Sequence, residues 1–234
     1  MVQFFWEKEI TKLEHLLGGK EKPGVYEYQF LSKAESYKKI FRSIPWILWI
    51  AICNSVSMNA CHKDSDIDLF IITKRNRIWT TRVIITLILS LLWERKNEKK
   101  HRDKFCLSFF ITEDFLDLSS LALEKDIYLA YWIENLIPLI EKENMFQKFK
   151  DANIWYQIEG KERKAQKRKE EIIPRKSHIF SSCYEYIFQK IFLKKTKKSF
   201  QKLWKPFWII IEENILKFHN KDKRKEIQEK IYGK

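Results

Sequence analysis

Two aspartates, Asp66 and Asp68, are two residues apart at the head of the apolar segment 69–72. Side chains at positions i and i+2 of a β-strand point to the same face of a sheet. Two carboxylates placed that closely repel each other and are costly to remove from water. A divalent cation bound between them removes this penalty and can assist phosphoryl chemistry. The spacing therefore predicts a metal site at this acidic pair.

The competing explanation is that an Asp-x-Asp sequence caps or solvates the end of a strand. The metal hypothesis requires the two carboxylates to converge beside a cavity. It would be contradicted by divergent carboxylates, or by a neighbouring lysine or arginine that neutralises them with no cavity beside them.

The elements around the acidic pair follow from the apolar pattern. Residues 46–53 are apolar throughout and predict a buried strand, which Asn54 and Ser55 interrupt. A polar loop leads to a second strand over 67–73, and an apolar helix over 78–93 leads to a third strand over 105–111. The order is thus strand–strand–helix–strand, with the acidic pair at the start of the second strand.

This arrangement resembles the DNA polymerase β-like nucleotidyltransferase superfamily. The signature of that superfamily is a hydrophobic residue, Gly, then Gly or Ser, a gap of about a dozen residues, and an Asp-hydrophobic-Asp/Glu-hydrophobic run. The resemblance covers roughly residues 30–115. The matching positions are Cys53, Asn54, Ser55, Asp66, Ile67, Asp68 and Leu69.

The resemblance implies a nucleoside triphosphate substrate and transfer of a nucleoside monophosphate to a hydroxyl of an acceptor that the sequence does not identify. Asp66 and Asp68 would bind one or two Mg²⁺ ions, ~3.5–4 Å apart when both are present. Asn54 and Ser55 would form the turn that holds the triphosphate tail. Lys74 and Arg75, just after the second strand, would steer phosphates.

Two departures from the superfamily pattern leave an alternative open. Asn54 stands where the turn usually has Gly, and the strand at 105–111 contains no carboxylate for the third catalytic position. Asp103 precedes that strand and would supply the third carboxylate if the strand begins earlier; otherwise Cys106 or Ser108 fills the place. The alternative is a catalytically degenerate protein of the same fold that binds RNA or a protein partner.

Composition restricts the class of protein further. The formal net charge of +14 favours polyanionic partners, although lysine-rich solvated helix faces explain it as well. The four cysteines lack metal-type spacing and no secretory leader is apparent, which predicts free thiols in the cytoplasm. No apolar run reaches the ~20 residues of a transmembrane helix, so membrane contact could only be peripheral. The sequence does not indicate an oligomeric state.

The predicted fold class is α+β, with a small mixed-sheet nucleotidyltransferase core, flanking helices and an all-helical C-terminal region. Helices are expected over 3–17, from Lys33 to Arg42, and from Ser119 or Ser120 to Ile140. Further helices are expected over 145–158, 178–193 and 199–218. The predicted divisions are an N-terminal helix and turn at 1–24, the core at 25–115, a helical domain at 116–160, a basic linker or exposed helix at 161–176, C-terminal helices at 177–220, and a polar tail at 221–234.

Overall fold

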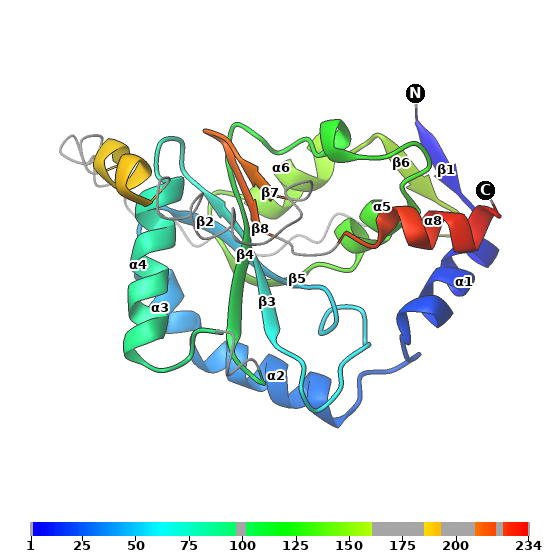
Figure 1. Cartoon of the computed structure of the whole chain (residues 1–234), viewed down its shortest axis with the longest axis horizontal. Helices are drawn as coiled ribbons and strands as arrows, with labels where there is room; N and C mark the ends of the chain where they lie inside the picture. The colour runs from blue at the N-terminus through cyan, green and yellow to red at the C-terminus, as the bar shows by residue number, and fades with distance from the viewer. Residues whose placement is uncertain (1, 97–101, 161–184, 193–208, 219–221, 234) are drawn as a thin grey trace.

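The computed structural model describes residues 2–96, 102–160, 185–192, 209–218 and 222–233. Its centre is a six-stranded mixed sheet with the strand order β5-β2-β3-β4-β8-β7, and β1 and β6 pair separately (Figure 1). Residues 185–192 form an additional helix. The elements in chain order are β1 (Gln3–Phe5), α1 (Glu7–Leu17), α2 (Val25–Ser36), α3 (Lys38–Arg42), β2 (Ile47–Cys53), β3 (Ile67–Thr73), α4 (Ile78–Leu91), β4 (Phe105–Thr112), the short 3₁₀ helix Ser119–Leu121, α5 (Ile127–Glu134), β5 (Ile137–Glu141), α6 (Met145–Ala152), β6 (Tyr156–Ile158), β7 (Ile209–Ile211), β8 (Ile215–Phe218) and α8 (Arg224–Tyr232).

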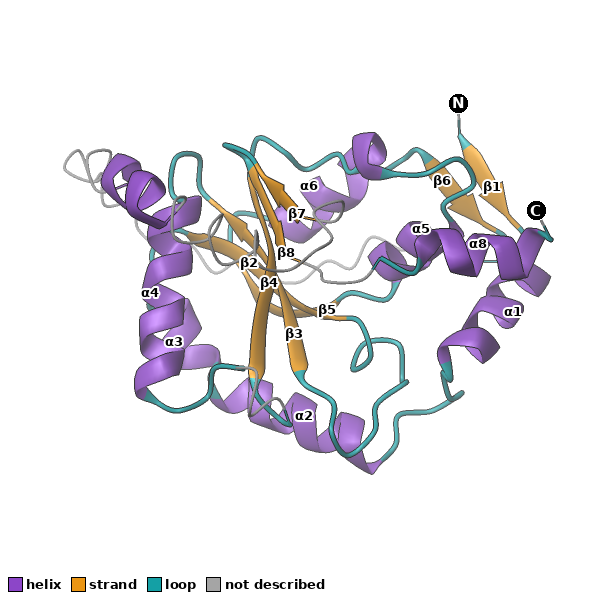
Figure 2. Cartoon of the chain, in the orientation of Figure 1, coloured by secondary structure: helices purple, strands orange, loops and turns teal. Residues whose placement is uncertain are grey.

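Helices cover both faces of the large sheet, so the fold is mixed α/β with three layers (Figure 2). On one face, α2, α3 and α4 pack against the sheet through residues such as Phe30, Phe41 and Ile85. On the other face, α1, α5, α6 and α8 enclose a second core that contains Phe149 and Ile227. Because both faces are covered, β2 is apolar along its whole length, and β3 and β4 are apolar along most of theirs.

The predicted strand–strand–helix–strand order is confirmed. Strands β2 and β3 are antiparallel, and β3 runs parallel to β4 after the chain crosses through α4. All seven residues of β2 are buried, as its unbroken apolar sequence indicates. These elements place the first residues of β3 and of β4 at the same end of the sheet.

The helix expected over 3–17 is correct only in its second part. Residues Gln3–Phe5 pair with β6 as a parallel strand, and α1 begins at Glu7. The helix expected from Lys33 begins earlier, at Val25, and continues after a break as α3. The carboxylate of Glu27 accepts hydrogen bonds from the backbone of Gly24 (2.9 Å) and of Cys61 (2.8 Å). These hydrogen bonds stabilise the start of α2 at Val25. A pattern based on a serine N-cap does not predict that start.

The prediction of helices alone beyond residue 115 is wrong. The expected helix to Ile140 ends at Glu134, and Pro138 lies in β5, at an edge of the sheet where its missing N–H leaves no partner unsatisfied. Part of the helix expected over 145–158 is instead β6. The described part of the helix expected over 199–218 forms β7 and β8, rich in β-branched isoleucine. The linker at 161–176 lies outside the described residues.

Segments far apart in sequence therefore complete one sheet. Strand β5 pairs with β2, and β8 pairs with β4, so both borders of the predicted core are covered by later parts of the chain. The tail expected to be irregular forms α8, which packs against α1 and α5. Within the described ranges, every helix is too short or too polar to cross a lipid bilayer.

Candidate metal centre and adjoining cavity

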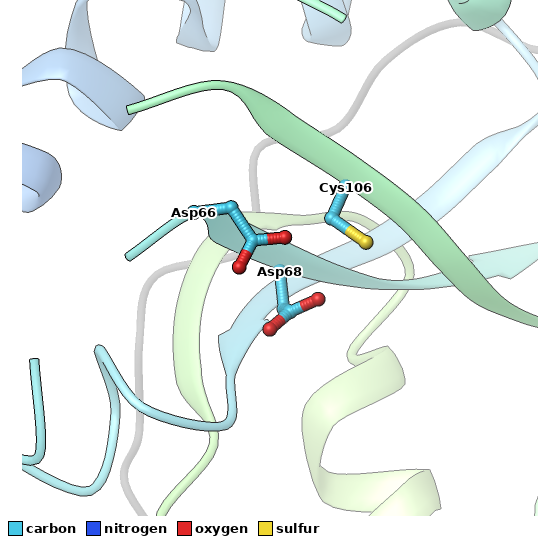
Figure 3. A group of neighbouring side chains, drawn as sticks. All are labelled: Asp66, Asp68 and Cys106. Atoms are coloured by element: carbon cyan, nitrogen blue, oxygen red, sulfur yellow. The ribbon is translucent and has the colours of Figure 1, made fainter. Parts of the chain in front are cut away.

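The acidic pair and one cysteine converge at the end of two neighbouring strands. Asp66 directly precedes β3, Asp68 is its second residue, and Cys106 is the register partner of Asp68 on β4. One ligand atom from each of the three side chains lies within 4.8 Å of the others (Figure 3). The convergence that the i, i+2 spacing predicts is therefore present.

The environment of Asp68 disfavours its negative charge. Burial raises the pKa of the Asp68 carboxyl, and the nearby charge of Asp66 raises it further. A hydrogen bond with the Asn54 side chain opposes both effects, and the resulting pKa is about 6. A cation beside the acidic pair would relieve this repulsion.

Asp66 already has a cationic partner. The Nζ atom of Lys96 lies 2.5 Å from Oδ2 of Asp66, whose side chain is 17% exposed. Within the described part of the chain, Asp68 forms no comparable ion pair. The charge of Lys96 also lowers the pKa of Asp68, but less than burial and Asp66 raise it. A metal ion would have to share Asp66 with Lys96 or displace it.

Asn54 has a structural reason to replace glycine in the turn. Its backbone is left-handed, with φ of 59°, a conformation that asparagine tolerates better than most residues. Its Oδ1 atom accepts a hydrogen bond from Nε1 of Trp132 at 2.9 Å, while its side chain also contacts Asp68. Asn54 therefore ties the turn to α5 and to the acidic pair, which a glycine could not do.

A cavity of about 270 Å³ adjoins this turn. Its lining includes Asn54 and Ser55, but neither of the two aspartates. Tyr128 connects the two regions: it lines the cavity, and burial first, then interaction with Cys53 and with the negative charge of Asp68, raises the pKa of its hydroxyl. The remaining lining residues are Leu17, Met58, Ala60, Phe109, Leu129, Trp132, Lys217, Asp222, Lys223, Arg224 and Ile227.

The structure does not bring Asp103 into the ligand group. Its carboxylate lies 3.1 Å from Lys33 Nζ and 3.6 Å from Lys104 Nζ, and its backbone N–H donates to the carbonyl of Ser65 at 2.9 Å. Because the strand does not begin early enough for Asp103, Cys106 stands beside Asp68 in the place expected for a third carboxylate. Ser108, the other residue considered for that place, is buried and lies outside the group.

Lys74 and Arg75 also lie away from the acidic pair. They follow the other end of β3, about 20 Å away at ~3.3 Å per strand residue. Lys74 pairs with Glu143 at 3.0 Å, and Arg75 forms two short contacts with Asp114. These cations stabilise the opposite end of the sheet.

Several residues at the site could not be found from sequence patterns. Lys96 follows α4 in a run of charges that offers no reason to single it out. Trp132 and Tyr128 have helical spacing that indicates core packing, and α5 does contribute to the core. Lys217 reaches the cavity only because β8 pairs with β4 in the register Phe109↔Lys217.

Fold and site together define a mixed α/β protein with an acidic pair and an amphipathic cavity at one end of its sheet. The chain matches no protein-family model, no curated protein and no solved structure. Any functional assignment therefore depends on the geometry described above.

Proposed function

We propose that the protein is a Mg²⁺-dependent nucleotidyltransferase that transfers a nucleoside monophosphate from a nucleoside triphosphate to a hydroxyl of an acceptor. The proposal depends on one observation: Asp66 and Asp68 converge at the start of β3, next to a turn that carries Ser55 and opens onto a cavity. Sequence motif and geometry agree at these residues. The proposed setting is the cytoplasm, where the cysteines would remain thiols.

The donor atoms suit a hard cation only in part. Two carboxylates provide the oxygen ligands that Mg²⁺ prefers, with water completing the coordination. The thiol of Cys106 is a softer ligand, and burial raises its pKa well above the usual value, so it stays protonated. Bound Mg²⁺ would neutralise charge on the α-phosphate and on the departing pyrophosphate.

The chain's own residues would orient the substrate. Ser55 lines the cavity and would donate its hydroxyl to the triphosphate tail. The acceptor oxygen forms a bond to the α-phosphorus, the bond to the β-phosphate bridging oxygen breaks, and pyrophosphate leaves. The acceptor's proton passes to water.

The decisive test compares Asp68→Ala with Asp64→Ala, an exposed acid in the loop before β3. We expect Asp68→Ala to abolish Mg²⁺-dependent ATP binding by calorimetry and to leave the circular dichroism spectrum intact. Asp64→Ala should bind like the wild type. Equal Mg²⁺ and ATP affinities in Asp68→Ala and the wild type would exclude the proposed metal site.

The degenerate alternative is favoured by the ion pair between Lys96 and Asp66 and by the position of Asp103. In that case the protein holds RNA or a protein partner without transferring a nucleotide. Incubation with α-³²P-labelled nucleoside triphosphates and cellular RNA or protein separates the two functions. Only an enzyme leaves a covalently labelled acceptor that depends on Asp68.

A further inference from the structure

The cavity beside the turn is lined by two chemically different groups of side chains. The apolar lining comes from α1, the turn, α5 and α8 and includes Leu17, Met58, Leu129 and Ile227. The basic lining comes from β8 and the start of α8 and consists of Lys217, Lys223 and Arg224. A cavity with both kinds of lining suits a ligand that has an apolar body and a charged group.

The basic residues that line the cavity differ in whether their charge is paired. Arg224 is paired with Asp222 and with Asp126, each at 2.7 Å, so these three charges satisfy one another. Lys217 has no ion pair and donates no hydrogen bond within the described part of the chain. Its Nζ lies 5.8 Å from the ring centroid of Phe109, which also lines the cavity.

Two other buried cations donate hydrogen bonds to backbone oxygens. Lys142 donates to the carbonyls of Arg42 and Ile44, and Arg82 donates to the carbonyl of Leu107. Lys217 lacks such acceptors. Burial first, then the charge of Arg224, lowers its pKa to about 8, and the negative charges of Asp222 and Asp126 oppose this shift only in part. A half-buried ammonium group that faces a cavity without a partner is costly unless a ligand supplies the negative charge.

We propose that this cavity binds a small organic anion, with Lys217 as its cationic contact and the apolar lining around its hydrophobic body. A carboxylate and a phosphate both offer anionic oxygens to Lys217. Binding requires no metal ion, because the acidic pair does not line the cavity. The inference concerns the same cavity that would receive the triphosphate tail in the proposed function, and anion binding in the absence of metal tests it independently of nucleotidyl transfer.

The test uses 8-anilinonaphthalene-1-sulfonate, a fluorescent aromatic anion, with the full-length protein in EDTA. We expect one binding site per chain. Lys217→Met, which keeps the length of the side chain but removes its charge, should weaken binding at least about tenfold. The matched control is Lys190→Met, because Lys190 also lies over an aromatic ring, at 4.7 Å from that of Tyr186, but does not line the cavity.

A second variant tests the cavity without changing a charge. Ala60 lines the cavity, and Ala60→Phe should fill it and abolish dye binding. This variant still tests whether the dye binds in the cavity if Lys217→Met does not fold. Thermal unfolding checks that each variant is native. Wild-type binding by both folded variants would overturn the proposal, as would the lack of a single saturable site.

Displacement of the dye identifies the anionic group. Phenyl phosphate alone should displace it if the site takes phosphates, and benzoate alone if it takes carboxylates. Displacement by neither would contradict an organic-anion site. Asp68→Asn should bind the dye normally, so a failed metal site and a failed anion site give different results.

Discussion

The raised pKa of Asp68 means that its ionisation destabilises the folded state. The folded pKa is about 6, against an ordinary value of 3.8, because burial and Asp66 both disfavour ionisation. A carboxyl group whose pKa is raised by folding lowers the free energy of unfolding when it is ionised. The penalty therefore grows as pH rises from about 4 to 6 and stays constant above that range. At ~1.4 kcal/mol per pKa unit, it is on the order of 2–3 kcal/mol.

Replacing this carboxylate by a neutral isostere should stabilise the metal-free protein. Asp68→Asn is expected to raise the free energy of unfolding by about 1–3 kcal/mol at pH 8, because no charge is then buried. Urea denaturation at pH 8 and at pH 4 measures this, and the gain should shrink at pH 4, where wild-type Asp68 is protonated in the folded state. A gain that is equal at both pH values would contradict the raised pKa.

Lys96 occupies the position where a cation would bind Asp66. Lys96→Met should strengthen Mg²⁺ binding by about tenfold, because the ion would no longer compete with an ammonium group 2.5 Å from the carboxylate. Calorimetric titration with MgCl₂ measures the change. Lys33→Met is the matched control, since Lys33 pairs with Glu94 and Asp103 outside the ligand group.

If Lys96 serves only to neutralise a degenerate site, its removal would have a different effect. Lys96→Met would then lower stability, because Asp66 would lose its ion pair with Lys96, and Mg²⁺ binding would not appear. Stability measured with and without Mg²⁺ distinguishes the two outcomes.

The sequence predicted the parts of the site that local spacing determines. Asp66 and Asp68 share one side of β3 because strand geometry alternates every residue. Cys106 joins them because the pairing of β3 with β4 sets its register, which no local pattern fixes. The position of Lys217 at the cavity is harder still to predict. It depends on the pairing of β8 with β4, which are more than a hundred residues apart in the chain.

At the scale of elements, α4 shows how a distant segment stabilises a helix. The side chain of its N-cap residue, Arg77, forms no capping hydrogen bond, and the carboxylate of Glu185 accepts hydrogen bonds from the N–H groups of Trp79 and Thr80, both at 2.8 Å. Glu185 is buried, and its negative charge faces the positive end of the helix dipole. The helix at 185–192 is thereby anchored to the sheet layer.

Removing the negative charge of Glu185 should destabilise both α4 and the helix at 185–192. Glu185→Gln leaves a single acceptor oxygen for two N–H groups, and we expect a loss of about 1–2 kcal/mol in the free energy of unfolding. Chemical denaturation followed by circular dichroism measures the loss. Glu21→Gln, at an exposed position, should be close to neutral, and an equal effect in both variants would contradict the capping role.

Elements were predictable where one local signal dominated. The wholly apolar run of β2 fits its pattern because burial on both sides sets its composition, and the fourteen-residue α4 fits the length of its apolar run. Helices alone were predicted after residue 115 because aromatic residues recur there at helical spacing. Residues of β5 and β8 form strands instead because they pair with β2 and β4. Tertiary pairing thus outweighed local preference.

The whole molecule is held together by contacts that cross the predicted divisions. Trp49 and Phe70, on the central strands, pack against Phe149 of α6 with ring centroids 5.2 and 5.4 Å apart, and Phe70 lies 5.1 Å from Trp132 of α5. Each large side chain buried in this way contributes about 1.5–3 kcal/mol. The core at 25–115 therefore owes one of its two hydrophobic faces to later parts of the chain.

An isolated fragment of residues 25–115 should consequently fail to fold cooperatively. It would expose the aromatic face of β2 and β3 and leave the edges of β2 and β4 without β5 and β8, which favours association between sheet edges. We expect aggregation at micromolar concentration and no sigmoidal urea transition by circular dichroism, whereas the full chain should show one. A soluble, cooperatively unfolding fragment would show instead that residues 25–115 form a domain of their own, and that the later strands only extend its sheet.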